Sequence, residues 1–225
     1  MKVVITQPFY IPWMGYFAMM DIADIFVFYD DVQFVLQSWH SRNRIKTSNG
    51  VQWLTVPTRK NFGQKINQVE VKGLRWEDDH IKTIEQAYSK APHFEIYWEY
   101  VSRIFEIDWI YLSELTTYSI RTLAELLDIG MPKFIKSSEL EGIQGQKTDR
   151  VLSVLEKLGA DEYISGMAAK DYLEEDKFKD IKLTWFDYQH PTYPQIRGEF
   201  VSHMSVIDLL FNTGDKAIDY IREGS

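Results

Sequence analysis

Short apolar runs separated by polar breaks predict a strand–helix–strand unit in the first part of the chain. Lys2 to Thr6 is apolar and β-branched, which is typical of a buried strand. Met14 to Ile22 is apolar over a helical length, and Pro12 fits the first turn of that helix. Asp24 to Tyr29 predicts a second buried strand. This order over about thirty residues indicates a βαβ unit with a parallel strand pair.

The same patterns continue along the rest of the chain. Strands are predicted over 51–57, 68–72, 134–135, 162–166 and 181–186, with a polar loop over 58–65. Helices are predicted over 76–90, 94–105, 111–127, 148–158, 205–211 and 216–221. We therefore expect an α/β, Rossmann-like fold with a largely parallel sheet and helices on both faces. Residues 1–225 would form a single domain, with a helical insertion at about 76–127.

Composition narrows the class of protein. The 225 residues contain no cysteine, which excludes disulfides, thiolate metal sites and a cysteine nucleophile. The net charge of −8 argues against broad nucleic-acid binding, but a local basic pocket can still hold a small anion. No apolar stretch approaches the ~20 residues of a membrane span, and the first apolar run is too short for a signal peptide. We expect a cytoplasmic protein without stable membrane insertion.

Polar side chains follow three of the predicted strands. Gln7 follows the first, with Tyr10, Trp13 and Tyr16 shortly after it. Asp30 and Asp31 follow the second, with Gln33 two residues later, and Ser165 precedes a short predicted helix. Ligands of parallel α/β sheets bind beyond the carboxyl ends of strands, and free N–H groups at a helix start attract anions. In the alternative interpretation, the two aspartates only cap the next turn.

The densest basic stretch runs from Trp39 to Lys46. Its Arg42 and Arg44 carry guanidinium forks suited to carboxylate or phosphate, and Asn43 adds a hydrogen-bond donor. These arginines are candidates for holding an anionic substrate. The alternative is an internal ion pair with Asp30 and Asp31.

Acid–base candidates are few. His190 follows the last predicted strand and is the best placed of five scattered histidines, although a structural or surface role is the alternative. The spacing of the histidines matches no metal motif, and neither a P-loop nor a G-x-G-x-x-G sequence is present. The sequence therefore indicates no metal and names no cofactor.

The N-terminal motif Gln7-Pro8-x-Tyr10-x-Pro12-Trp13-x-Gly15-Tyr16-Phe17 resembles the start of the WbqC-like protein family. The resemblance extends through Asp30-Asp31-Val32-Gln33-Phe34, Arg42-Asn43-Arg44-Ile45, Trp53-Leu54-Thr55-Val56-Pro57 and Tyr193-Pro194-Gln195. The family is associated with gene clusters for O-antigen and other surface polysaccharides. Its members are described as glycine transferases or as enzymes that decorate amino sugars, so the resemblance implies such an activity without assigning residue roles.

A more distant resemblance concerns the start of the first predicted helix. Trp13-Met14-Gly15-Tyr16 stands in the place of the H-x-G-H motif of HUP-type nucleotidyltransferases and pantothenate-synthetase-like ligases, whose histidines contact ATP phosphates. Only the glycine agrees here. The resemblance implies a HUP-like topology, while the aromatic rings lack the charge of imidazole.

Three functions fit these observations. The leading hypothesis is a transferase that adds an acyl or aminoacyl group, possibly glycine, to an amino sugar. The alternatives are an ATP-dependent ligase or nucleotidyltransferase-like enzyme with a degenerate H-x-G-H motif, and a non-catalytic protein that binds sugar nucleotides. The substrate would be a small anion, either a nucleotide sugar or an activated acyl donor.

We expect catalysis from Asp30, Asp31 and His190. We expect substrate binding by Gln7, Tyr10, Trp13, Tyr16, Gln33, Arg42, Asn43, Arg44, Ser165 and Gln195.

Overall fold

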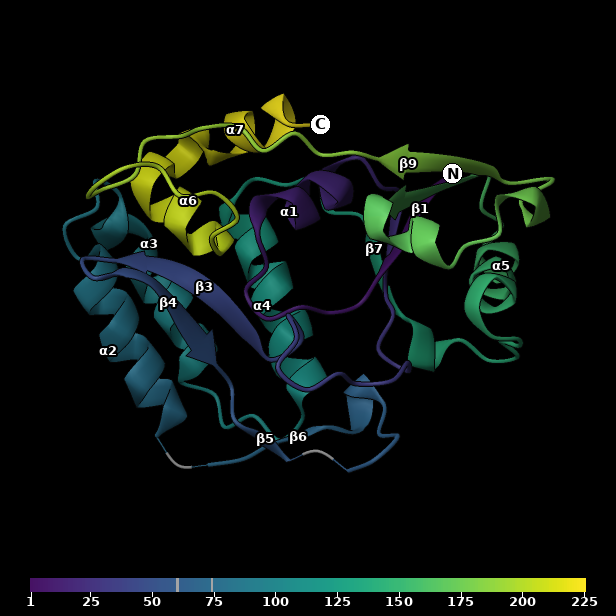
Figure 1. Ribbon diagram of the computed structural model, residues 1–225, viewed down its shortest axis with the longest axis horizontal. Coiled ribbons are helices and arrows are strands. Elements are labelled where there is room, and N and C mark those ends of the chain that lie inside the picture. Colours follow the sequence, from purple (N-terminus) through teal and green to yellow (C-terminus); the bar gives the residue numbers. More distant parts are fainter. Residues whose placement is uncertain (60, 74) are drawn as a thin grey trace.

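A five-stranded parallel sheet forms the centre of the computed structural model, which describes residues 1–59, 61–73 and 75–225 (Figure 1). The strands are β1 (Lys2–Thr6), β2 (Ile25–Phe28), β7 (Lys133–Lys136), β8 (Glu162–Gly166) and β9 (Lys182–Phe186). Their spatial order is β7-β2-β1-β8-β9, and every neighbouring pair is parallel. The order reverses between β1 and β8, which is where Rossmann-like sheets open a crevice for ligands.

Helices cover both faces of this sheet. Along β1, Val3 and Ile5 pack in one apolar cluster with α5 (Lys147–Leu158), whereas Val4 packs in the larger cluster on the other face. The larger cluster includes α1 (Met14–Asp21), which joins β1 to β2. Because side chains alternate along a strand, each face of the sheet needs its own cover. The predicted α/β, Rossmann-like fold and its first βαβ unit are confirmed.

The region between β2 and β7 extends the molecule on one side of the sheet (Figure 1). Its strands form two antiparallel hairpins: β3 (Arg42–Thr47) with β4 (Gly50–Thr55), and β5 (Thr58–Arg59) with β6 (Glu70–Val71). Its helices are α2 (Trp76–Tyr88), α3 (Phe94–Ser102) and α4 (Leu112–Leu126). These three helices lie where the sequence predicted a helical insertion.

Two local predictions differ from this region. The basic stretch after Trp39 had no predicted element, and it forms β3. The predicted loop over 58–65 begins with the short strand β5, and its residue 60 lies outside the described residues. Both strands are stabilised by pairing with a partner strand rather than by an apolar pattern of their own.

The chain closes with α6 (Val206–Thr213) and α7 (Ala217–Glu223), which lie beside α1 on the larger apolar cluster. The short 3₁₀ helices are η1 (Ile66–Gln68), η2 (Arg103–Phe105), η3 (Ser137–Glu139), η4 (Met167–Asp171), η5 (Glu175–Lys177) and η6 (Gly214–Lys216). Within the described residues, no helix has both the length and the apolar character to cross a membrane.

Candidate functional site

The two aspartates after β2 are held by residues from η3 and α5. Asp30 is buried and accepts hydrogen bonds from the Ser138 hydroxyl at 2.8 Å and the Ser138 backbone N–H at 3.1 Å. Ser137 donates to Asp31 at 2.6 Å, and Arg150 forms an ion pair with the same carboxylate. Parallel strands bring the ends of β2 and β7 together, which explains this cluster of residues far apart in the sequence.

This cluster resolves one alternative that the sequence left open. The ionic partner of Asp31 is Arg150, and no ion pair within the described residues joins either aspartate to Arg42 or Arg44. The Asp31 side chain is mostly buried at the sheet edge. The pair is therefore anchored to the fold, and its expected catalytic role stays a prediction.

The loop between β1 and α1 is fixed in an unusual conformation. Ile11 is fully buried and has φ of 35°, in the left-handed region that β-branched residues rarely adopt. The Asn43 amide donates to the carbonyls of Tyr10 and Ile11 at 3.0 and 2.8 Å, and the Ser205 hydroxyl donates to Ile11 at 2.7 Å. Asn43 therefore holds the loop backbone, and its side chain is buried.

Gln7, at the end of β1, contacts a buried histidine. Its side-chain oxygen lies 2.7 Å from Nε2 of His40, and this acceptor places the imidazole proton on Nε2. Burial lowers the pKa of His40 to about 4. The imidazole is thus neutral at neutral pH, and it orients Gln7 at the opening of the sheet.

Trp13 ends this loop and folds back over the first turn of α1. A Cβ atom added to Gly15 would lie 2.4 Å from the Trp13 ring, so the indole occupies the space that a side chain would need. The packing of Trp13 thus explains why a glycine stands at position 15, independently of the H-x-G-H motif. Trp13 stacks on His203, with ring centroids 5.0 Å apart, and on His190 at 6.0 Å.

Gly15→Ala is expected to displace the Trp13 indole, because the new methyl group would overlap the ring. The indole N–H resonance of Trp13, assigned with Trp13→Phe, should shift in a ¹H–¹⁵N NMR spectrum. Gly130→Ala is the matched control, since its Cβ would meet its nearest atom at an ordinary 3.6 Å. An unchanged Trp13 resonance in Gly15→Ala would contradict the packing described here.

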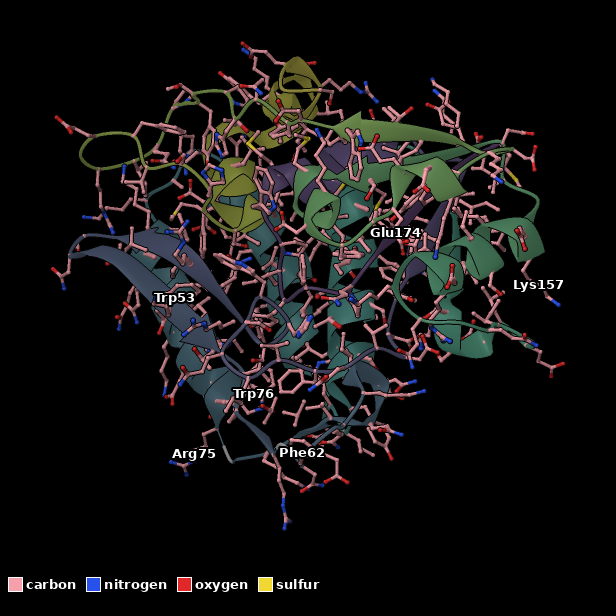
Figure 2. The ribbon with its side chains drawn as sticks, turned by 45° about the vertical axis from the view of Figure 1, so that its right-hand side comes forward. Trp53, Phe62, Arg75, Trp76, Lys157 and Glu174 are labelled. Carbon is pink, nitrogen blue, oxygen red and sulfur yellow. The ribbon has the colours of Figure 1, made fainter. Side chains whose placement is uncertain are left out.

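Next to this stack, two arginines and one tryptophan of the β3–β4 hairpin meet a second tryptophan, Trp39, from the segment just before β3. Trp39 and Trp53 are each 42% exposed, and their ring centroids lie 5.4 Å apart. The Arg42 guanidinium lies 4.3 Å from the Trp53 ring, and that of Arg44 lies 5.6 and 5.8 Å from the Trp39 and Trp53 rings. We call these four residues the aromatic–arginine surface. Figure 2 places Trp53 on the hairpin, at the opposite end of the molecule from Lys157 on α5.

The alternation of β3 explains this arrangement. Arg42 and Arg44 point to one face and are partly exposed, whereas Asn43 and Ile45 point inward and are buried. Trp53 lies directly opposite Arg44 in the strand register. Neither arginine forms an ion pair within the residues that the structure describes, and the Nε atom of Arg44 is buried without a hydrogen-bond partner there. No carboxylate of the described residues therefore neutralises either guanidinium group, and the exposed part of each can meet an anion.

His190 and His203 link this surface to Trp13. His190 is bonded at both nitrogens: Nδ1 donates to the Pro191 carbonyl at 2.8 Å, and Nε2 accepts the His203 backbone N–H at 3.0 Å. Arg44 in turn donates to the His203 carbonyl at 3.1 Å. Burial lowers the pKa of both imidazoles, and the charges of His190 and Arg44 lower that of His203 further. The sequence did not single out His203. The structure shows that its ring is exposed and that its Nε2 has no hydrogen-bond partner among the described residues.

Several residues expected to bind substrate lie inside the protein. Tyr10 and Tyr16 are fully buried; the Tyr10 hydroxyl bonds to His80, and that of Tyr16 bonds to the Gln7 carbonyl. Ser165 is buried within β8, and the helix after it is only the five-residue η4. Gln33 is exposed and forms a bridge to Lys65. The roles of these residues in binding stay predictions. In this conformation the two tyrosine hydroxyls bond to protein groups and do not face solvent.

Gln195 belongs to a buried polar network centred on Asp208. Asp208 accepts hydrogen bonds from Tyr88, Tyr193 and Gln195, each at 2.7 Å. Gln195 also accepts a bond from Lys46 at 3.0 Å. Burial raises the pKa of Asp208, and these hydrogen bonds oppose that shift. The network joins α2, β3, α6 and the segment before α6, so its contribution is to the fold around the hairpin.

Comparison with known proteins identifies the class to which this fold and site belong. The chain is 38% identical over 227 residues to Rv1507c, an uncharacterized protein of Mycobacterium tuberculosis, across 98% of this chain and 97% of that protein. The model of the WbqC-like protein family matches residues 7–220. The chain therefore belongs to the WbqC-like protein family, as the sequence motifs predicted. No solved structure matches it.

Proposed function

We propose that this protein is a transferase that attaches an acyl or aminoacyl group to the amine of an amino sugar, in the biosynthesis of a surface polysaccharide. The observation that carries the proposal is the grouping, on one part of the molecule, of exposed indole rings, a neutral imidazole and guanidinium groups that form no ion pair among the described residues. Indole faces pack well against the apolar faces of sugar and base rings. Guanidinium groups hold the phosphates of a nucleotide sugar or the carboxylate of a donor.

The reaction requires a base and a site for negative charge. The amine nitrogen bonds to the acyl carbon of an activated donor, the bond from that carbon to its leaving group breaks, and the amine loses a proton. Arg44 and Arg42 are suited to stabilise the oxyanion that forms in between. The expected bases Asp30, Asp31 and His190 already hold hydrogen bonds from protein groups. His203 offers a neutral imidazole beside Arg44, and we add it to them as a proton acceptor.

The test is direct product analysis. The protein is incubated with an activated glycine donor and a UDP- or dTDP-linked amino sugar, and mass spectrometry looks for the added acyl mass. Trp53→Ala, Arg44→Gln and His203→Gln should each lower the rate of product formation roughly tenfold or more, because each removes a group that would contact substrate. His203→Gln should also remove the fall in rate on the acid side, which we expect below pH 6.5 because the pKa of His203 is lowered.

Two control variants keep this test specific. Arg103→Gln removes an exposed arginine paired with Glu99, and Trp185→Ala removes a half-buried tryptophan on β9. Both should leave the rate unchanged. ATP consumption with release of pyrophosphate would instead favour the ligase alternative. Sugar-nucleotide binding without product from any donor would favour the non-catalytic alternative, and either result would overturn the proposal.

A further inference from the structure

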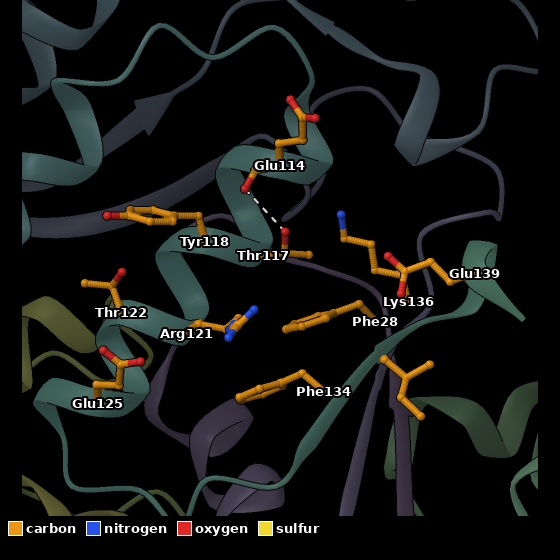
Figure 3. A pocket seen from close by; sticks show the side chains of 11 residues that line it. Phe28, Glu114, Thr117, Tyr118, Arg121, Thr122, Glu125, Phe134, Lys136 and Glu139 are labelled. Atoms are coloured by element: carbon orange, nitrogen blue, oxygen red, sulfur yellow. Dashed lines mark hydrogen bonds between the residues drawn. The ribbon is translucent and has the colours of Figure 1, made fainter.

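A separate cavity of about 500 Å³ lies between α4 and the strands β2 and β7 (Figure 3). One polar face of α4 lines it with Glu114, Thr117, Arg121 and Glu125, which recur at helical spacing. A helix that packs on a sheet normally turns its apolar side toward the strands. Here the apolar residues of α4 belong to the larger apolar cluster, and its polar face looks across the cavity toward the sheet edge.

The floor of this cavity is aromatic, and two cationic side chains, one from α4 and one from β7, line the space above it. Phe28 of β2 and Phe134 of β7 lie diagonally across the strand pair and stack with centroids 5.5 Å apart and an interplanar angle of 13°. The Arg121 guanidinium lies 5.3 Å from the Phe134 ring. Lys136, the last residue of β7, extends its ammonium group toward Thr117 (Figure 3). Within the described part of the chain, neither Arg121 nor Lys136 forms an ion pair or a side-chain hydrogen bond.

The acids of the cavity also lack a cationic partner in the described part of the chain. Glu114 and Glu125 lie about 16 Å apart along the α4 axis, on either side of Arg121, and Glu139 comes from η3. None of the three forms a salt bridge within residues 1–59, 61–73 and 75–225. Carboxylates accept hydrogen bonds but cannot donate them, so they need donors from a ligand or solvent. The site therefore offers cations at its centre and acceptors around them.

We propose that this cavity binds a small molecule that combines one phosphate or carboxylate group with several hydroxyl groups, as in a sugar phosphate or a sugar acid. The anionic group lies between the Arg121 fork and the Lys136 ammonium, where charge-assisted hydrogen bonds are strongest. The hydroxyl groups donate to the surrounding glutamates, and the Phe28–Phe134 pair supports the carbon skeleton. The glutamates exclude a second anionic group through like-charge repulsion. The binding does not depend on the transferase activity.

Calorimetric titration with five probes tests this proposal: glucose 6-phosphate, glucuronate, glucose, inorganic phosphate and glycine. Glucose 6-phosphate or glucuronate should bind about tenfold more tightly than both glucose and inorganic phosphate. Only the first two carry an anionic group for the cations of the cavity together with hydroxyl groups for its carboxylates. The better of the two identifies the anionic group. If neither binds more tightly than glucose and phosphate, or if glycine binds better than both, the proposal is wrong.

Variants and NMR locate the bound probe. Arg121→Gln and Lys136→Gln should each weaken binding about tenfold, whereas the exposed Arg103→Gln should leave it unchanged. Circular dichroism establishes that the variants are folded. In the unmodified protein, the probe should shift backbone amide signals of α4 and β7 rather than those of the β3–β4 hairpin. Shifts confined to the hairpin, or wild-type affinity in both folded variants, would overturn the site.

Discussion

Asp208→Ala is expected to lower the free energy of unfolding by roughly 3 to 5 kcal/mol. The substitution removes the shared acceptor of Tyr88, Tyr193 and Gln195, so the two buried tyrosine hydroxyls lose their acceptor while Gln195 keeps its bond to the Val201 carbonyl. It also removes the negative charge that faces the buried Lys46. Equilibrium urea denaturation, followed by circular dichroism, measures the change through the midpoint at a constant slope.

Asp215→Ala provides the comparison for this prediction. Asp215 accepts a hydrogen bond from one tyrosine hydroxyl, that of Tyr97, at an exposed position near the end of α6. The loss of this hydrogen bond should lower the free energy of unfolding by about 1 kcal/mol or less, because water replaces the carboxylate as acceptor. Equal losses for the two variants would mean that the buried network contributes no more than one surface hydrogen bond.

Acidification from pH 7 to pH 4 is expected to destabilise the protein by several kcal/mol through two buried histidines. Burial lowers the pKa of His40 and of His80 to about 4, from 6.5 in the unfolded chain. Between these values the unfolded state binds protons that the folded state does not bind. The contribution of the two histidines to the free energy of unfolding is therefore fully present above pH 6.5. It falls as the pH drops toward 4, by about 1.4 kcal/mol per pH unit for each histidine.

The contribution of His80 can be separated from that of the carboxylates. Urea denaturation at a series of pH values between 7 and 4 gives the slope of stability against pH for the wild type and for His80→Gln. The variant loses the Tyr10 hydrogen bond and is less stable at every pH, but its slope should be shallower by about 1.4 kcal/mol per pH unit. Parallel curves for the two proteins would contradict the neutral, buried state of His80.

The fold was predictable because its central strands are short apolar runs. β1, β2 and β8 are buried, and their sequences keep β-branched or aromatic residues together between polar breaks. β3 was missed because Arg42, Arg44 and Lys46 interrupt it with charge. Those charges are stabilised by contacts with indole rings and with the distant Gln195, which no local pattern reveals.

The sequence predicted where some of the candidate residues lie in the fold, but not which groups they contact. Sequence reasoning placed Gln7, Asp30 and Asp31 at strand ends, and they lie there. It could not assign Arg150 as the partner of Asp31, because 119 residues separate the two. It also could not distinguish His203 from the other histidines, since the exposure of a ring and the bonding of its nitrogens depend on tertiary contacts.

The loop around Ile11 also constrains the order in which this chain can assemble. Its backbone is held by Asn43, by Ser205 and by a bond from Val206 to Pro12, so residues about 190 positions apart must meet before the loop can adopt its final form. Contacts of such long sequence separation form late in folding. As the ribosome releases the chain from its N-terminus, Trp13 and the surface beside it are therefore completed only after nearly the whole protein has been made. A partly synthesised chain would carry most of the sheet, but not yet the conformation that places Trp13 against His203.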